Sequence, residues 1–150
     1  MIGRTLGGAT VATLQGIIVF FIAIAAGFRP TNITLLPVAF LIMVMTALFF
    51  TAMGTALASL LEDMQGFQMI MNFLVMPIFF LSGALFPLEG LPDSIFIAAS
   101  LNPLTYGVDG LRGALAGQMH FSFITDFAVL SLVTALFLVV GSYLFSKIEI

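Results

Sequence analysis

Residues 76–116 decide the fold, and they read MPIFFLSGALFPLEGLPDSIFIAASLNPLTYGVDGLRGALA. The stretch leaves a long apolar segment and is then broken by Pro87, Gly90 and Pro92. A short apolar run follows and ends at Asn102-Pro103. About eight apolar residues cannot cross a bilayer, which takes about twenty in a helix. We therefore expect residues 87–117 to form a short helical hairpin that dips into the membrane or lies at its surface.

The composition identifies an integral membrane protein. Hydrophobic residues make up 61% of the 150 residues and charged residues only 7%, against about 25% charged in a soluble domain. The absence of cysteine excludes disulfides, thiolate metal sites and thiol catalysis. The net charge of -3 comes with no basic patch, so the sequence does not favour nucleic-acid binding.

Four apolar segments read as membrane-spanning helices, over about residues 8–27, 34–61, 67–82 and 123–145. The predicted fold is an all-α integral membrane protein with four transmembrane helices and a re-entrant or interfacial hairpin between the third and the fourth. An even number of spans leaves both termini on one side. The first segment has an alternative interpretation, because Arg4, an apolar core and Ala23-Ile24-Ala25 are also typical of a secretory signal peptide.

Small and weakly polar residues recur every four positions in the first two segments. One ridge is Gly8, Ala12 and Gly16, and a second stripe contains Thr51 and Thr55. Such ridges let helices approach closely in lipid. The same stripe could instead line a transport path. Two single amides, Gln15 and Asn72, either form a hydrogen bond to a neighbouring helix or contact the substrate.

Charged residues are few and lie near the ends of the segments. Glu62 and Asp63 form a turn that is either simply solvated or contacts a soluble partner. Asp126 falls where the positive end of a helix dipole favours a carboxylate. Asp109 and Arg112 are three residues apart, a spacing at which two helical side chains can form an ion pair. This pair either orients the hairpin or takes part in gating.

Sequence signatures of catalysis and of metal binding are absent. There is no GxxxxGK[ST] loop, and the only lysine is Lys147. His120 has no second histidine, cysteine or matched carboxylate at ligand spacing. The chain is therefore predicted to be neither an enzyme nor a metalloprotein. No ionisable residue lies in the middle of a span, which disfavours an ion-coupled secondary carrier.

Residues 79–112 resemble the permeases of ABC-type-2 transporters, the membrane subunits of bacterial exporters of drugs, antibiotics, polysaccharides and lipo-oligosaccharides. That family ends its fifth helix in an S-G-x-x-F-P-like motif, matched here by Ser82, Gly83, Phe86 and Pro87. After a short hairpin comes an N-P-x-x-Y/H-x-x-D-x-x-R-like motif, matched by Asn102, Pro103, Tyr106, Asp109 and Arg112.

The resemblance implies a membrane subunit without a cofactor of its own, paired with a separate ATPase that binds ATP and Mg, and with a second permease copy, identical or different. It implies the bacterial inner membrane, cytoplasmic termini and an outer hairpin that acts as a gate. Charge alone does not orient the chain, because Arg4 and Lys147 balance Arg29 and Arg112 under the positive-inside rule.

In the family, an amphipathic helix, two more spans and a coupling loop precede the segment that corresponds to residues 8–27. The chain is therefore expected to be the C-terminal portion of a permease, read from an internal start or as a fragment. The import permeases' EAA-x3-G motif is not matched by Leu61 to Gln68, so export of a hydrophobic or amphipathic substrate is favoured. A small membrane scaffold or assembly subunit and a secondary carrier are the alternatives.

Overall fold

The computed structural model describes residues 2–61 and 63–146 of the chain, and within these ranges there is no β-strand. The helices, in chain order, are α1 (Ile2–Ala25), the 3-10 turn η1 (Ile33–Leu35), α2 (Leu36–Ala58), α3 (Met64–Leu81), α4 (Asp93–Ser100), α5 (Pro103–Ala116) and α6 (Phe123–Ser146). The predicted all-α class is confirmed.

The described ranges contain four helical segments long and apolar enough to cross a membrane. They are Ile2–Ala25, Ile33–Ala58, Met64–Leu81 and Phe123–Leu144. A helix of 24 residues such as α1 rises about 36 Å at about 1.5 Å per residue, which exceeds a hydrocarbon core of about 30 Å. The eight residues of α4 and the 14 of α5 are too few to do so. The predicted hairpin between the third and fourth spans is therefore confirmed.

Local sequence signals explain where the helices of this region begin and end. The Asp63 carboxylate accepts hydrogen bonds from the backbone amides of Gln65 and Gly66, which caps the start of α3. The Asn102 side chain does the same for α5, whose first residue is Pro103. At the other end of α5, Gly117 adopts a left-handed conformation with φ of 70°, which glycine takes up without a steric penalty.

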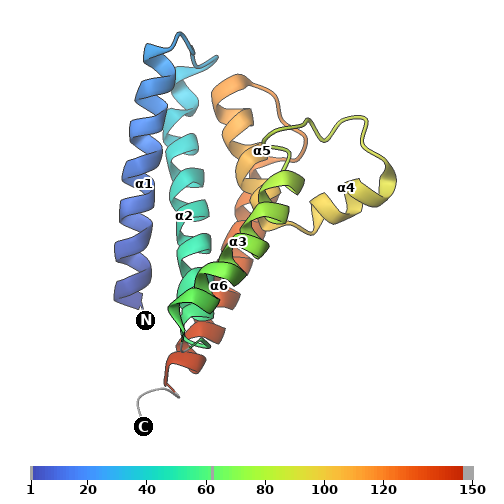
Figure 1. Ribbon diagram of the computed structural model, residues 1–150. Helices are drawn as coiled ribbons and strands as arrows, with labels where there is room; N and C mark the ends of the chain where they lie inside the picture. Colours follow the sequence, from blue (N-terminus) through green and yellow to red (C-terminus); the bar gives the residue numbers. More distant parts are fainter. Residues whose placement is uncertain (1, 62, 147–150) are drawn as a thin grey trace.

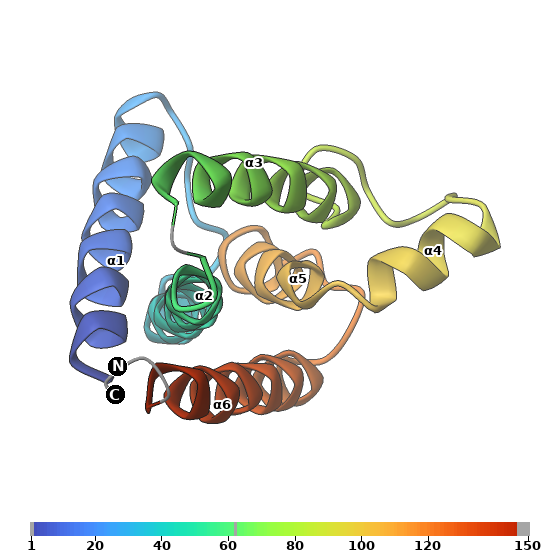
Figure 2. The same cartoon turned by 60° about the horizontal axis from the view of Figure 1, so that its bottom comes forward.

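Helix α2 lies in the middle of the bundle, with α1, α5 and α6 around it (Figure 2). It is apolar on all sides, which is typical of a helix that is either buried or in lipid. Ile42 and Phe49 of α2 are almost completely buried, and the Phe49 ring packs edge-to-face against Phe137 of α6, with 5.7 Å between centroids. Helix α3 runs obliquely across this bundle (Figure 1) and has no buried residue.

The predicted ridge on α1 and stripe on α2 meet each other. A Cβ added at Gly8 would lie 2.5 Å from Cγ2 of Thr51, so only glycine allows this approach. Gly16 fits in the same way against Met43. The Thr51 and Thr55 hydroxyls donate to the carbonyls four residues before them, each at 2.7 Å. Thr51 therefore packs between helices, as the packing interpretation of the stripe predicts.

The hairpin stays in the half of the molecule opposite the start of α1 and the end of α6 (Figure 1). Helix α4 projects away from the bundle, and α5 returns to pack on α2 and α6. A Cβ at Gly107 would lie 2.5 Å from Oγ1 of Thr46, and one at Gly110 would lie 2.6 Å from Cδ1 of Ile42. Gly107 and Gly110 therefore lie on the surface of α5 that contacts α2.

Candidate functional site

Helix α5 is held to the end of α3 by side chains that donate to backbone carbonyls. The Asn102 side-chain amide donates to the carbonyl of Ile78 on α3. The Arg112 guanidinium donates to the carbonyl of Gly83, with an Nη2–O distance of 2.8 Å. The last carbonyls of a helix have no partner within it, so these donors satisfy acceptors that would otherwise be unpaired at the end of α3.

Asp109 faces the opposite way and holds the segment after α5. Its carboxylate accepts two backbone hydrogen bonds, from the amides of His120 and Phe121, each at 2.8 Å. The Asp109 side chain is buried, with 6% of its surface exposed. Hydrogen bonds to a charged group contribute about 1.5–3 kcal/mol each, more than the roughly 0–1 kcal/mol of an exposed ion pair. Backbone contacts therefore position this carboxylate.

The predicted ion pair between Asp109 and Arg112 is wrong for the chain as the structure describes it. The two side chains point to different partners, the carboxylate to amides 11 and 12 residues later and the guanidinium to a carbonyl 29 residues earlier. The three-residue spacing places the two residues at neighbouring positions on α5. Each side chain nevertheless forms its hydrogen bonds with backbone groups and not with the other side chain. Both residues therefore connect α5 to backbone groups of the neighbouring segments.

Two further side chains of α5 close the turn between α4 and α5. The Tyr106 hydroxyl donates to the carbonyl of Ser100 at 2.8 Å, and its ring packs on Phe121 with 5.0 Å between centroids. Burial, together with the Asp126 carboxylate, raises the pKa of Tyr106 above its ordinary value, so the phenol keeps the proton that it donates. Thr105 is completely buried and donates to the carbonyl of Ala99 at 2.7 Å. Sequence reasoning missed Thr105, although it stands inside the N-P-x-x-Y motif.

The motif at the end of α3 separates into a structural part and an exposed part. Ser82 is buried, and its hydroxyl donates to the carbonyl of Phe79 at 2.6 Å. Gly83 has φ of 77°, and a Cβ there would lie 3.1 Å from Leu88. Phe86 and Pro87 are exposed. The first two residues thus shape the turn out of α3, and the last two lie on its surface.

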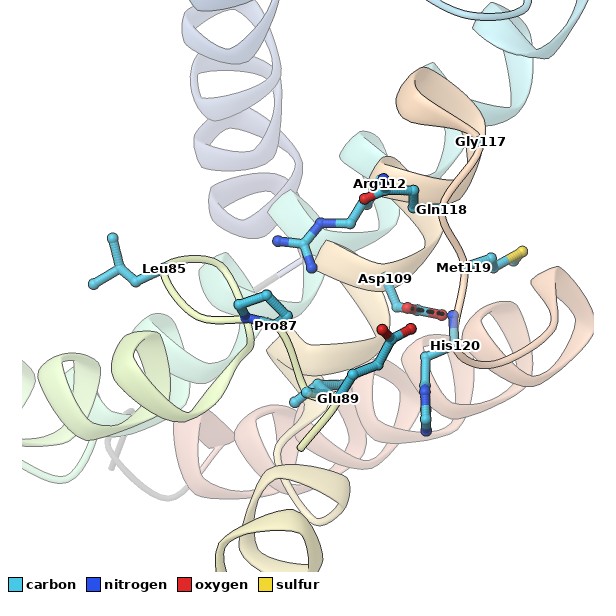
Figure 3. Close-up of a pocket in the computed structure, with 10 residues that line it drawn as sticks. Leu85, Pro87, Glu89, Asp109, Arg112, Gly117, Gln118, Met119 and His120 are labelled. Carbon is cyan, nitrogen blue, oxygen red and sulfur yellow. Dashed lines mark hydrogen bonds between the residues drawn. The ribbon is translucent and has the colours of Figure 1, made fainter. Parts of the chain in front are cut away.

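A cavity of about 570 Å³ lies between the loop after α3 and the segment after α5 (Figure 3). Its charged and polar side chains are Glu89 from the loop after α3, Asp109 and Arg112 from α5, and Gln118 and His120 from the segment after α5. Leu85, Pro87, Leu88 and Met119 form its apolar wall. The cavity can accept a group that carries both hydrogen-bonding and apolar surface.

Asp126 is a buried carboxyl group whose burial is not predicted by the sequence pattern. It lies in the first turn of α6, as predicted, but it is completely buried, and neither carboxylate oxygen has a hydrogen-bond partner among the described residues. The effective penalty for burying a carboxylate is several kcal/mol. The helix dipole stabilises a carboxylate in the first turn by about 0.3–1 kcal/mol, and by up to about 2 kcal/mol in favourable geometries. The dipole alone therefore does not account for this position.

The remaining predicted polar residues lie away from the hairpin. Gln15 on α1 and Asn72 on α3 are exposed, and neither side chain makes a hydrogen bond within the described part of the chain. Asp63 is exposed and caps α3. The predicted partner contact at Glu62 lies outside the described residues. The structure thus brings together the hairpin residues but not Gln15, Asn72 and Asp63.

Comparison with known proteins agrees with this architecture. The profile of the family described as "ABC-2 type transporter" matches residues 1–116. The chain is similar to Nodulation protein J of Rhizobium leguminosarum bv. trifolii, at 31% identity over 79% of this chain and 44% of that protein. Nodulation protein J of Rhizobium leguminosarum bv. viciae is 29% identical over 79% of this chain and 45% of that protein. The protein of the same name from Sinorhizobium fredii is 28% identical over 87% of this chain and 51% of that protein.

The chain spans about half the length of these curated relatives. No solved structure matches it. The family profile nevertheless covers α1 to α5, including Asn102, Asp109 and Arg112. From the four apolar helices, the hairpin and this match, we conclude that the chain belongs to the ABC-2 type transporter family.

Proposed function

We propose that this chain is the C-terminal portion of an exporter permease, that it forms part of the substrate path, and that the hairpin of residues 87–117 is its outer gate. The observation that carries the proposal is the double attachment of α5. On one side Asn102 and Arg112 hold the end of α3, and on the other Asp109 holds the segment at residues 120–121. One short helix thus links two spans at the same end of the bundle.

The nature of these contacts supports a gate more than a fixed plug. They are hydrogen bonds between single side chains and backbone groups. Helices α3 and α4 share few other contacts with α5, whose main packing surface is the glycine side against α2 and α6. Packed elements switch between discrete arrangements rather than deforming continuously. A hairpin held in this way can have a docked arrangement and a lifted arrangement, and a driving partner can shift the populations of the two.

The proposed driving partner is a separate ATPase subunit on the side of the bundle where α1 begins and α6 ends. The chain carries no nucleotide-binding loop, so hydrolysis belongs to that partner. We infer a location in the bacterial inner membrane, with the termini in the cytoplasm and the cavity of about 570 Å³ at the outer surface. The mixed lining of this cavity suits an amphipathic substrate.

Helix α3 supports a second permease copy as a further partner. Gln65, Gln68 and Asn72 are exposed and follow a spacing of three and four, which puts their amides on one face of the helix. An unpaired amide in hydrocarbon is costly, and amides of neighbouring membrane helices pair with each other. The same face of a second copy offers both donors and acceptors, so two α3 helices can satisfy each other.

The gate can be tested by its accessibility, because the chain has no cysteine of its own. Ala99, where α4 ends, is completely buried. In membranes that also contain the ATPase, Ala99→Cys should react with a membrane-impermeant maleimide faster when the transporter turns over ATP than when ATP is depleted. Arg29→Cys, which is exposed in the α1–α2 turn, should react equally fast in both conditions and serves as the control. Equal reaction of Ala99→Cys in both conditions would contradict the gate.

A further inference from the structure

Asp126 is a buried group to which neither the permease motifs nor the hairpin contacts assign a role. It lies on the inward face of α6 together with Leu130 and Thr134, at a spacing of four residues. Its side chain is 0% exposed, and both carboxylate oxygens are unpaired within residues 2–61 and 63–146. A buried polar atom without a partner is uncommon in folded proteins and calls for a specific explanation.

Helix α5 covers this carboxylate. A Cβ added at Gly110 would lie 3.1 Å from Oδ2 of Asp126 and 2.6 Å from Cδ1 of Ile42 on α2. The bare backbone at Gly110 thus fits over the carboxylate in a position where a side chain would clash. Since α5 belongs to the hairpin, docking of the hairpin is the step that removes water from Asp126.

The charges that face Asp126 do not compensate for this burial. The carboxylate of Asp109 and the phenol of Tyr106, both on α5, interact electrostatically with it. The first of these interactions is repulsive. Helix α2 carries no titratable side chain from Leu36 to Ala58, and the guanidinium of Arg112 is directed to Gly83. Docking therefore brings a second carboxylate towards Asp126 and brings no donor to it.

We infer that Asp126 is a positioning residue of the gate, which weakens the docking of α5 on α6 so that the docked and lifted arrangements of the hairpin stay close in free energy. This inference rests on the proposed role of the hairpin as a gate. Arg112, Asn102 and Asp109 stabilise the docked hairpin, and Asp126 opposes them. A partner can then shift the two populations with a modest difference in affinity.

The test compares Asp126→Asn, which keeps the shape and removes the charge, with Thr134→Val. Thr134 is also buried on α6, and its hydroxyl is also unpaired in the described chain, but it lies two turns farther from the start of the helix. Accessibility is measured at Ala114→Cys on α5, where the native side chain is 1% exposed. The assay uses a membrane-impermeant maleimide on membranes of cells that make the transporter with its ATPase.

Asp126→Asn should slow the labelling of residue 114 by about tenfold, because it removes a buried carboxyl group that has no hydrogen-bond partner and lies near the Asp109 carboxylate. It should also raise the thermal unfolding midpoint. Thr134→Val should leave the labelling rate of residue 114 within about twofold of the rate without that substitution, because Thr134 lies away from the contact between α5 and Asp126. Asp126→Ala, which removes the carboxylate without adding a donor, should slow the labelling as Asp126→Asn does.

Unchanged or faster labelling in Asp126→Asn, or a lower unfolding midpoint, would overturn the inference and make Asp126 a stabilising group. Equal slowing in Thr134→Val would also overturn it, because the effect would then be a general one on α6. Failure of the gate itself gives a different result. In that case Asp126→Asn still slows labelling, but ATP turnover does not change the labelling of Ala99→Cys.

Discussion

The guanidinium of Arg112 on α5 donates a hydrogen bond to the carbonyl of Gly83, 2.8 Å away, at the turn that follows α3. The contact joins residues that are 29 positions apart. Gly83 has φ of 77°, a left-handed conformation that favours glycine. This conformation directs the carbonyl of Gly83 towards Arg112. The hairpin is thus fastened to the preceding span by an interaction that depends on the geometry of a single glycine.

Replacing Arg112 with alanine should loosen the hairpin without preventing membrane insertion. Loss of one hydrogen bond from a charged donor should speed the labelling of Ala99→Cys by about tenfold and impair export. Arg29→Ala removes an exposed charge from the α1–α2 turn and is the matched control, for which normal labelling is expected. Normal export by Arg112→Ala would mean that the contact with Gly83 is dispensable.

The hydrogen bonds of Asp109 should contribute more to the free energy of unfolding than an ion pair with Arg112 would. Asp109→Ala removes the acceptor of two backbone amides and should lower the free energy of unfolding by about 2–5 kcal/mol. Asp109→Asn keeps one acceptor oxygen and should lose about half as much. Thermal unfolding of the purified transporter in detergent measures both. A loss no greater than that expected for an exposed ion pair, about 1 kcal/mol or less, would contradict this assignment.

The close approach of α5 to α2 should make Gly107 intolerant of a side chain. In Gly107→Ala the new methyl group would lie 2.5 Å from Oγ1 of Thr46, a short side chain close to its own backbone. We expect a loss of about 1–3 kcal/mol, typical of overpacking. Gly7→Ala on α1, where a Cβ meets nothing within 4 Å, should be neutral or stabilising by about 0.5–1 kcal/mol. Equal unfolding midpoints for the two variants would contradict the proposed packing.

The amide face of α3 predicts a specific contact between two copies. A cysteine at Asn72 should form an oxidative cross-link between copies in the membrane, since a disulfide needs Cα atoms within about 7 Å. A cysteine at Phe73, which is 83% exposed and about 100° farther round the helix, should cross-link much less. Cross-linking at residue 73 but not at residue 72 would assign a different face of α3 to the contact.

The sequence predicted the parts of this fold that depend on length and on local breaks. Four apolar segments are long enough to span, and the residues around Pro87 and Asn102 cannot continue a helix, so the spans and the hairpin follow directly. The boundaries differ by a few residues. Helix α1 begins at Ile2, so Arg4 lies inside the first helix instead of before it.

The contacts within the site could not be predicted in the same way. Spacing along a helix reveals which side chains are neighbours, and it suggested Asp109 and Arg112 as partners. Their actual partners are backbone groups brought close by the tertiary fold, which no spacing encodes. The burial of Asp126 was missed for a related reason. In an apolar membrane helix such as α6, the hydrophobic pattern does not distinguish the face that packs on protein from the face that meets lipid.

The sidedness of the hairpin is the most direct test of the account. Single cysteines at Ser94 and Gln118, which stand at exposed positions of α4 and of the segment after α5, are labelled in spheroplasts with a membrane-impermeant maleimide. Met64→Cys at the start of α3, 82% exposed, reports on the other end of the bundle. The account predicts that Ser94 and Gln118 react from outside and Met64 only after the cells are opened. Reaction of Ser94 and Gln118 from opposite sides would show that the chain crosses the membrane between them, and would contradict the gate.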